Sequence, residues 1–451
     1  MAINAEAALM DKIVSLGKRR GFVFQSSEIY GRLNGCWDYG PLGVELLRNL
    51  KEMWWQAMTY RVDIEGIDAA ILMHPRVWEA SGHVENFTDP MVDCKECKAR
   101  FRADQIEDAA CGSPAYKGRK AAKCQAEGKF TETRQFNLMF KTFIGPLEDS
   151  SAVVFLRPET AQGIYVNFLN VQTSSRQKLP FGIAQIGKAF RNEINTKNFL
   201  FRTREFEQME MQFFVKPGTD GEWFEYWKEQ RLQWYVELGM TRSKLQWLLP
   251  DKLAHYAKAA ADIEYEFPFG WGEIEGIHNR TDYDLSRHEE FSGKSMKYFD
   301  EETKEKFTPY IIETSAGASR SFMAFLIDAY REEEAPTADG KTEIRSVMKF
   351  HRKLAPVKAA VFPLVNRDGM PEIARKIEAA VRQHFRVFYD DSGAVGRRYR
   401  RQDEIGTPYC FTVDSQSLVD QTVTVRERDS MKQERVSMDS IVSYLRDAFT
   451  S

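Results

Sequence analysis

The stretch that decides the fold runs from Gln185 to Phe214 and reads QIGKAFRNEINTKNFLFRTREFEQMEMQFF. It predicts two strands joined by a loop that carries both arginine and glutamate. Successive side chains of a strand point to opposite faces, so Phe206, Gln208 and Glu210 project together, while Met209 points the other way. The ring and the carboxylate at the two ends of that face would lie about 13 Å apart.

Such a face suits a ligand that combines a nucleotide with an amine. An arginine fork can grip a phosphate through two hydrogen bonds, an aromatic ring can stack on a base, and a carboxylate can hold an ammonium group. The alternative is a mixed-charge hairpin whose charges are merely solvated. This stretch alone leaves both interpretations open.

Length and composition set the outer limits of the interpretation. A chain of 451 residues is long enough for two or three domains, and 43% hydrophobic with 29% charged residues is typical of a globular protein. A net charge of −3 argues against a generally basic RNA coat protein, so any RNA must be bound by local patches. We see no apolar run of about 18 residues and no secretory leader, which predicts a cytoplasmic protein without a membrane span.

A second dense motif reads TPYIIETSAGASRSFMAFLIDAYREEE. It predicts a strand from Tyr310 to Glu313, a turn of small residues, and a helix that begins near Ala318. Gly317 lets a ligand approach the backbone, and the free N–H groups of a helix start favour an anion, which Arg320 would reinforce. A tight strand-to-helix turn with a serine cap would need no ligand.

Four of the six cysteines lie between Cys94 and Cys124, in a polar segment that reads as an inserted module. Cys94 and Cys97 have the spacing of half a zinc site. The remaining pair, Cys111 and Cys124, is widely separated. A four-cysteine zinc site and a metal-free remnant therefore both stay open.

Three further segments allow a structural and a functional interpretation. A long helix predicted after Gly43 carries an apolar stripe that suits either the core or a subunit interface. Glu273 and Glu275 alternate along a predicted strand and could face one side as magnesium ligands. The run of arginines around Tyr399, in the C-terminal α/β segment, suits RNA phosphates and base stacking or a solvated helix face.

The motifs, taken in order, resemble those of class II aminoacyl-tRNA synthetases, and among these the chain looks like the dimeric glycyl-tRNA synthetases. Phe190 to Glu193, followed by Arg202 to Phe206, is similar to the second class II motif. Gly317 to Arg320 is similar to the third. The segments GCWDYGPLG, LRPETAQGIYVNF and WGEIEGI extend the resemblance over nearly the whole chain.

The resemblance implies an α+β fold with two domains. A catalytic domain built on an antiparallel sheet would span residues 1–350, with a knuckle-like insertion at about 88–135 and a helical insertion at about 218–262. An α/β anticodon-binding domain would span residues 351–451. For the apolar stripe of the helix after Gly43, the resemblance favours a homodimer interface over the core.

The resemblance further implies an activity: glycine and ATP would form glycyl-adenylate, and the glycyl group would pass to tRNA(Gly). ATP would contact Arg191, Asn192, Glu193, Phe201, Arg202, Phe206, Glu273, Ile274, Gly317 and Arg320. Phe206 would stack on adenine, Arg191 and Arg320 would act as the catalytic arginines, and Glu273 would carry Mg²⁺. Glycine would meet Arg102, Glu159, Glu210, Glu313 and Ser315.

Two departures from the family pattern and two rivals remain. The expected second C-x-x-C reads Cys124 to Glu127, so zinc would have to use Cys111, and Thr314 stands where the family usually has proline. One rival is a class II enzyme for threonine, proline or histidine. The other is a non-catalytic, synthetase-like RNA-binding protein, against which Arg191, Phe206 and Arg320 argue.

Overall fold

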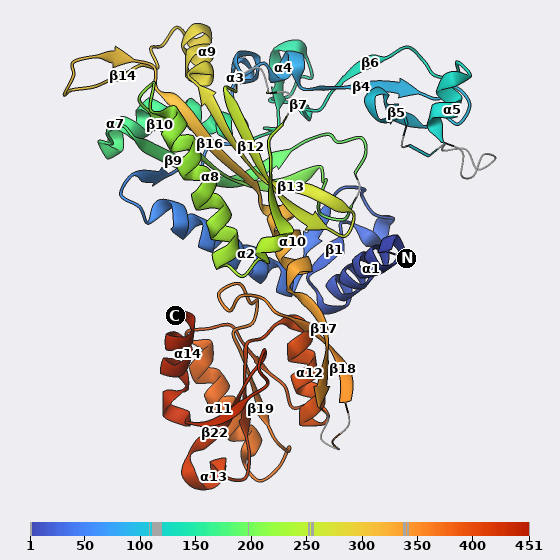
Figure 1. Cartoon of the computed structure of the whole chain (residues 1–451), viewed down its shortest axis with the longest axis vertical. Helices are drawn as coiled ribbons and strands as arrows, with labels where there is room; N and C mark the ends of the chain where they lie inside the picture. The colour runs from blue at the N-terminus through green and yellow to red at the C-terminus, as the bar shows by residue number, and fades with distance from the viewer. Residues whose placement is uncertain are drawn as a thin grey trace.

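The computed structural model describes residues 2–107, 109–110, 120–196, 198–250, 253, 257–336, 340 and 342–450. Its centre is a seven-stranded sheet of order β11-β12-β13-β16-β10-β9-β3, in which β3 is parallel to β9 and the other neighbours are antiparallel (Figure 1). The strands are β3 (Ile64–Gly66), β9 (Phe181–Phe190), β10 (Glu205–Val215), β11 (Leu245–Leu248), β12 (Ala259–Phe267), β13 (Gly270–Thr281) and β16 (Tyr310–Gly317).

The hairpin predicted from Gln185 to Phe214 forms the β9 and β10 pair of this sheet. Glu210 pairs with Gln185 on one side and with Ser315 of β16 on the other. Gly276 of β13 is the next partner of Ser315. The two dense motifs of the sequence therefore lie on adjacent strands at the centre of the sheet.

One face of the sheet packs on the main hydrophobic core. Odd-numbered residues of β10, such as Met209, Met211 and Phe213, are fully buried there, as the period-two pattern predicts. The helices α2 (Pro41–Thr59), α8 (Asp220–Glu237) and α10 (Ala318–Ala329) contribute to this core. The shorter helices α6 (Ala161–Tyr165), α7 (Phe168–Ser175) and α9 (Tyr283–Ser292) cover part of the opposite face around Phe214.

The apolar stripe of α2 is part of this core. Leu46, Leu50 and Trp54 are buried against the sheet of the same chain, and Trp54 has no exposed surface. Val44, near the start of the same helix, is exposed at 39%. The core interpretation is therefore correct for the stripe, so a subunit interface on this helix would have to use other residues.

The segment predicted as a helical insertion, at about 218–262, contains strands of the central sheet as well as a helix. Among the residues of this range that the structure describes, α8 is the only α-helix. It is followed by a 3-10 turn and by β11 and the first residues of β12, which form one edge of the central sheet. Leu245 and Ala261 belong to the main core. The segment completes the sheet, so it is not a separate insertion.

The cysteine-bearing segment projects from the sheet as a small module (Figure 1). It contains a three-stranded sheet, β4 (Thr88–Asp93), β5 (Arg100–Arg102) and β6 (Arg134–Asn137), and the helix α5 (Ala121–Ala126). Its own apolar cluster includes Val92, Phe101 and Ile106. The bounds of the predicted insertion, about 88–135, stay a prediction.

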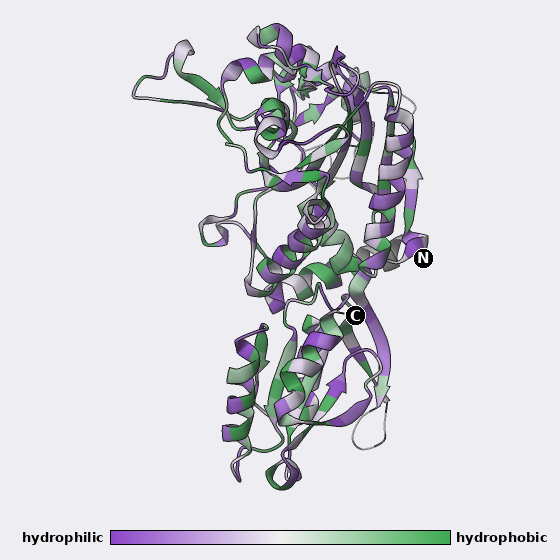
Figure 2. Ribbon diagram, turned by 90° about the vertical axis from the view of Figure 1, so that its left-hand side faces the viewer, coloured by the Kyte–Doolittle hydropathy of each residue, from purple (hydrophilic) through white to green (hydrophobic). Residues whose placement is uncertain are grey.

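The C-terminal segment has its own sheet, of order β20-β19-β21-β22-β23, and its own hydrophobic core. Its elements are β19 (Ala359–Pro363), α11 (Met370–Arg382), β20 (Val387–Tyr389), α12 (Val395–Ile405), β21 (Tyr409–Val413), α13 (Ser417–Asp420), β22 (Thr422–Glu427), β23 (Gln433–Ser437) and α14 (Ile441–Thr450). Figure 2 shows mostly hydrophobic strands among helices striped with both kinds of residue. Helix α10 runs directly into the hairpin of β17 (Tyr330–Pro336) and β18 (Thr342–Met348), which leads to this part of the chain.

The arginine run around Tyr399 lies on α12, and most of its side chains have partners within the chain, while its contact with RNA stays a prediction. Arg398 is 2% exposed and donates to the carbonyl oxygens of Pro363, Asp391 and Gly393. The Tyr399 hydroxyl bonds Thr412 at 2.6 Å. Arg400 and Arg401 pair with Glu343 and Asp390 at 2.7 and 2.6 Å.

The remaining helices and strands lie outside the central and C-terminal sheets. They are α1 (Ala2–Arg20), β1 (Val23–Gln25), β2 (Trp37–Tyr39), α3 (Pro75–Ala80), α4 (His83–Asn86), β7 (Lys141–Phe143), β8 (Val153–Phe155), β14 (Tyr298–Phe299) and β15 (Lys306–Phe307). Helix α1 ends in Lys18, Arg19 and Arg20, as predicted for a helix C-terminus. Within the described ranges, no helix is long and apolar enough to cross a lipid bilayer.

Candidate functional site

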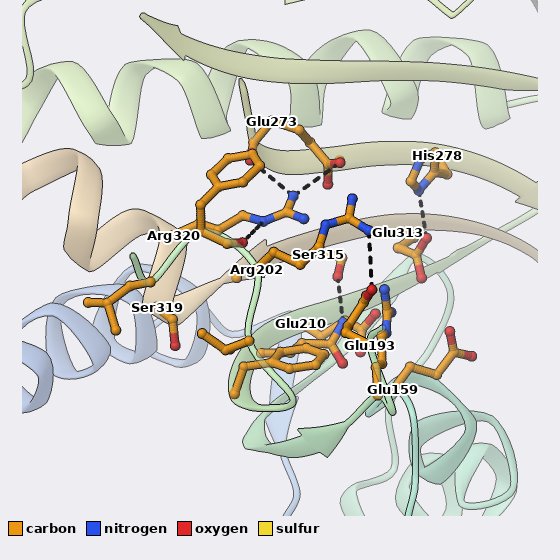
Figure 3. Close-up of a pocket in the computed structure, with 18 of the residues that line it drawn as sticks. Glu159, Glu193, Arg202, Glu210, Glu273, His278, Glu313, Ser315, Ser319 and Arg320 are labelled. Atoms are coloured by element: carbon orange, nitrogen blue, oxygen red, sulfur yellow. Dashed lines mark hydrogen bonds and ion pairs between the residues drawn. The ribbon is translucent and has the colours of Figure 1, made fainter. Parts of the chain in front are cut away.

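A cavity of about 200 Å³ opens on the face of the sheet opposite the main core. Its lining comprises Glu159, Arg191, Glu193, Leu200, Phe201, Arg202, Thr203, Phe206, Gln208, Glu210, Glu273, Gly276, His278, Arg280, Glu313, Ser315, Gly317, Ser319 and Arg320. Phe206, Gln208 and Glu210 face it together, which confirms the predicted shared face of β10. Figure 3 shows Arg320 and Glu273 close together, and Glu159 and Glu210 in another part of the cavity.

Arg320, in the first turn of α10, is held at one end of the cavity. Its Nη1 lies 3.1 Å from the carbonyl oxygen and 3.2 Å from the carboxylate of Glu273. Its guanidinium also stacks 4.5 Å from the ring centre of Phe201. Desolvation by the surrounding protein opposes ionisation of Glu273, although its side chain is 48% exposed at the cavity. The charge of Arg320 outweighs this effect and lowers the pKa of Glu273. This end of the cavity therefore carries a fixed arginine beside an ionised carboxylate.

Arg191 lies on the wall of the cavity, at the end of β9. Its guanidinium is 5.3 Å from the ring centre of Phe206 and 5.4 Å from that of Phe87, and Nε donates to the carbonyl of Pro158 at 3.1 Å. Arg202, from the loop after β9, pairs with Glu193 at 3.2 Å. Together with Arg320 these side chains place three of the four lining arginines away from the carboxylates Glu159, Glu210 and Glu313, which suits a polyphosphate.

The other end of the cavity gathers three carboxylates from three elements. Glu159 precedes α6, Glu210 lies on β10, and Glu313 lies on β16. The side chain of Glu159 is 15% exposed, and Glu210 and Glu313 are 2% and 3% exposed. Three buried carboxylates with room beside them favour a cationic ligand, because each would otherwise raise the free energy of ionising the others.

Glu313 is held in its ionised form by two basic residues of β13. His278 Nδ1 lies 2.7 Å from its carboxylate, and Arg280 Nη1 lies 3.2 Å from it. Burial alone would raise the pKa of Glu313, but Arg280 and His278 outweigh it and lower the pKa. Similarly, His83 and Arg280 outweigh burial and lower the pKa of Glu159.

Sequence reasoning missed Arg280 and gave His278 no role at the site. The available signal was alternation: Gly276, His278 and Arg280 follow one another at every second position of β13 and share the cavity face. Arg280 also pairs with Asp284 at 2.7 Å, which ties α9 to the site. The structure therefore adds a basic rim to the carboxylate end.

Glu210 differs from the other two carboxylates. Its side chain accepts a hydrogen bond from the Thr160 hydroxyl, and no basic side chain pairs with it in the described part of the chain. Burial, followed by the charges of Glu313 and Glu159, raises its pKa to about 8. An incoming ammonium group would favour its ionised form.

Glu275 does not face the cavity, which corrects the prediction that it shares a face with Glu273. The register of β12 against β13 shifts between these residues: Glu273 pairs with Glu264, Glu275 pairs with Ile263, and Ile274 has no partner. This β-bulge reverses the alternation. Glu275 is fully buried behind the sheet and pairs there with Arg231 at 2.6 Å.

The other predicted site residues lie outside the cavity. The guanidinium of Arg102 pairs with Asp89 and Asp104 at 3.0 and 2.8 Å in the cysteine-bearing module, so it does not reach the carboxylates. Ile274 is 1% exposed in the main core, and Asn192 lines a neighbouring hollow. Direct side-chain contacts of Arg102 and Ile274 with ligands in this cavity are not supported by this geometry.

The predicted zinc ligands are only partly described. Cys94 and Cys124 are each 1% exposed in the apolar cluster of the module, and Cys97 packs against it. Cys111 lies outside the described residues. Over the residues that the structure describes, no group of three or more His, Cys, Asp or Glu side chains is arranged to hold a metal ion. Zinc therefore stays a prediction.

Two family models match the chain, and the first of them includes every residue that lines the cavity. One, described as tRNA synthetase class II core domain (G, H, P, S and T), matches residues 101–330, and one described as Anticodon binding domain matches residues 358–448. The chain therefore belongs to the class II aminoacyl-tRNA synthetases, and its curated relatives place it in the glycine–tRNA ligase family.

Two of these relatives cover almost the whole chain. The glycine–tRNA ligase of Treponema denticola is 59% identical over 97% of this chain and 96% of its own length. That of Thermobifida fusca is 55% identical over 99% and 98%. A prolyl-tRNA synthetase from Cryptosporidium parvum, solved with L-proline and AMP, superposes with a TM-score of 0.63 over 97% of this chain and 74% of that one. At 14% identity it shows the fold alone.

Proposed function

We propose that this cavity joins glycine to ATP as glycyl-adenylate and then passes the glycyl group to tRNA(Gly). One observation carries the assignment of the site: a single cavity has three carboxylates at one end and three arginines toward the other. The first end suits the ammonium group of an amino acid, and the second suits a triphosphate. The relatives named glycine–tRNA ligase support glycine over threonine, proline or histidine.

The glycine ammonium group would lie among Glu159, Glu210 and Glu313. Ser315 faces the same space, and its hydroxyl is 3.3 Å from Gln208 Nε2. A methyl group rejected by simple contact contributes only about 1–3 kcal/mol of discrimination. A cavity lined by charged and hydrogen-bonded groups would reject alanine more steeply, because a methyl group would displace polar contacts.

The first step would need no protein nucleophile. A glycine carboxylate oxygen attacks the α-phosphorus of ATP, the bond to the bridging oxygen breaks, and pyrophosphate leaves. Arg191 would stabilise the charge that grows on the α-phosphate, and Arg202 and Arg320 would hold the β- and γ-phosphates. Phe206 would stack on adenine.

Glu273 would provide a carboxylate for Mg²⁺. One carboxylate together with phosphate oxygens is a donor set that this ion accepts, and the Glu273 side chain is 48% exposed at the cavity. The ion would neutralise part of the triphosphate charge. Glu275 is excluded from this role by its burial behind the sheet.

In the second step a terminal ribose hydroxyl of tRNA attacks the carbonyl carbon of the adenylate, and AMP leaves. The C-terminal sheet and its helices would bind the anticodon arm, in keeping with the matched anticodon-binding model. We also propose a division into a catalytic domain, residues 1–350, and an anticodon-binding domain, residues 351–451. The homodimer and the cytoplasmic location stay predictions from the sequence.

Pyrophosphate exchange into ATP, measured with each amino acid in turn, tests this function. We expect exchange that depends on glycine, and charging of tRNA(Gly) by the same preparation. Exchange that depends on threonine, proline or histidine would contradict the substrate. No exchange with any amino acid would contradict the enzymatic assignment and favour a non-catalytic RNA-binding protein.

A further inference from the structure

A buried ion pair lies directly behind the Arg320 end of the cavity, on the core face of the sheet. Arg231 of α8 binds Glu275 of β13 through two contacts, Nε to Oε1 at 2.6 Å and Nη2 to Oε2 at 3.2 Å. Their side chains are 2% and 0% exposed. A fork of this kind fixes both the distance and the angle between the helix and the strand.

The same helix also holds α10, which carries Arg320. Tyr235, one turn after Arg231, has its hydroxyl 3.1 Å from that of Ser321, the residue after Arg320. The Tyr235 ring stacks on Phe325 of α10 at 6.0 Å. Burial and the nearby Glu275 carboxylate hold the pKa of Tyr235 well above its ordinary value, so its hydroxyl stays protonated. Helix α8 therefore contacts both β13 and α10, the two elements that carry Glu273 and Arg320.

The β-bulge at Ile274 connects the buried pair to the cavity. Glu275 points to the core and Glu273 to the cavity, with Ile274 as the additional residue between them. Both the carbonyl and the carboxylate of Glu273 hold Arg320. Glu275 also pairs through its backbone with Ala316, the neighbour of Gly317. A shift of Glu275 would therefore move the groups that hold Arg320.

We propose that Arg231 and Glu275 are positioning residues that set the Glu273–Arg320 pair for the triphosphate of ATP. Neither side chain touches the cavity, and their effect passes through the bulge on β13 and through α10. This inference rests on the proposed function, because it assigns ATP to the Arg320 end.

The main test is the double variant R231M with E275Q. Removing one partner alone would leave a buried charge, whereas replacing both removes the fork without that cost. Affinity for a non-hydrolysable ATP analogue would be measured by calorimetry, and the KM values for ATP and glycine by pyrophosphate exchange. We expect nucleotide affinity to fall roughly 10-fold or more, with ATP KM rising in step and glycine KM changing less than about twofold.

A second variant, R231K, keeps the charge and covers the case in which the double variant fails to fold. Lysine is a point charge without the fork, so we expect the same selective rise in ATP KM, at roughly a third of the size. An unchanged nucleotide affinity would overturn the proposal, as would ATP and glycine KM values that rise by the same factor.

The control is another buried pair joined by two contacts, between α12 and β22 of the C-terminal segment, in which Asp403 also binds Arg345 at 3.0 Å. Arg426 contacts Asp403 at 2.9 and 3.1 Å, and the side chains are 5% and 1% exposed. R426M with D403N is expected to lower thermal stability but to leave nucleotide affinity unchanged. Equal losses of nucleotide affinity in the control and the test variant would show that lower stability explains the loss, and would refute the positioning role of Arg231 and Glu275.

Failure of this inference is separable from failure of the proposed function. Glycine-dependent exchange by the unaltered chain tests the function. Calorimetric binding of the nucleotide requires no turnover, so it still tests the positioning residues if the amino acid is not glycine. An unaltered chain that does not bind the nucleotide at all would refute both.

Discussion

The guanidinium of Arg320 lies over the ring of Phe201, with its carbon 4.5 Å from the ring centre, and its Nε donates to the carbonyl of the same residue at 3.1 Å. Arg320 opens α10, whereas Phe201 belongs to the loop between β9 and β10. The loop of one class II motif is therefore held against the arginine of another by contacts within the protein. Such an arginine is already oriented when a phosphate arrives, which reduces the entropy lost on binding.

Arg320→Lys should weaken ATP use selectively. Lysine keeps the charge but cannot stack on Phe201 and hold the Glu273 carbonyl at once. We expect kcat/KM for ATP in pyrophosphate exchange to fall roughly 100-fold, with little change in the melting temperature. The matched control is Arg375→Lys, because Arg375 lies over the ring of Tyr389 at 4.2 Å in the C-terminal domain. An equal loss in both variants would contradict the proposed role.

Glycine binding should release a proton near neutral pH. The pKa of Glu210 is raised to about 8, so the carboxyl is largely protonated at pH 7 and must ionise to hold an ammonium group. Glycine affinity should therefore increase as the pH rises from about 6 to 8 and then level off. Calorimetry in buffers of different ionisation enthalpy measures the released proton. Glu210→Gln should abolish it, and a wild-type chain that releases none would refute the assignment.

The same raised pKa affects stability with the opposite sign. In the unfolded chain Glu210 ionises near its ordinary value of about 4.3, whereas in the folded chain it resists ionisation until about pH 8. Its contribution is most favourable at low pH and is lost as the pH rises toward 8. Across this range Glu210→Gln should remove that part of the pH dependence, which thermal unfolding at several pH values would detect. Identical pH dependence in the two proteins would contradict the raised pKa.

Arg398 and Arg397 should behave differently although they are adjacent. Arg398→Ala would leave three carbonyl acceptors without their donor and should lower the free energy of unfolding by about 2 kcal/mol or more. Arg397 is exposed, and its substitution by alanine should change stability by less than about 0.5 kcal/mol. Urea unfolding followed by circular dichroism compares them. Equal stability of the two variants would contradict the structural role of Arg398.

Leu50→Ala should destabilise the chain through its core. Leu50 is 1% exposed between α2 and the sheet, and cavities of this kind cost about 2–5 kcal/mol. The oligomeric state of the folded variant should remain that of the unaltered chain, because the side chain is covered within one subunit. Sedimentation of both proteins provides the check. A folded variant that dissociates would contradict the core position of Leu50 and indicate that it lies at a subunit interface.

The parts of the site on continuous patterns could be predicted from the sequence. The face of Phe206, Gln208 and Glu210 follows from the period of a strand, and Gly317 to Arg320 is a local motif. The structural role of Arg398 could not be predicted because its acceptors are backbone carbonyls of other segments, which composition does not reveal. Arg280 was missed because its value depends on Glu313, 33 residues later along the chain. Partners that meet only through folding leave little trace in a local pattern.

The bulge at Ile274 keeps the two glutamates of β13 on opposite faces of the sheet. The side chain of Ile274 lies in the core and contributes no polar group to the cavity. In a regular strand two residues separated by one position share a face, so without the bulge Glu273 and Glu275 would point the same way and one of the two would lose its partner. A substitution that keeps an apolar side chain at position 274 is expected to be tolerated, whereas a charged one would bury an unpaired group in the core. The irregularity of the strand is therefore as much a functional element as the glutamates themselves.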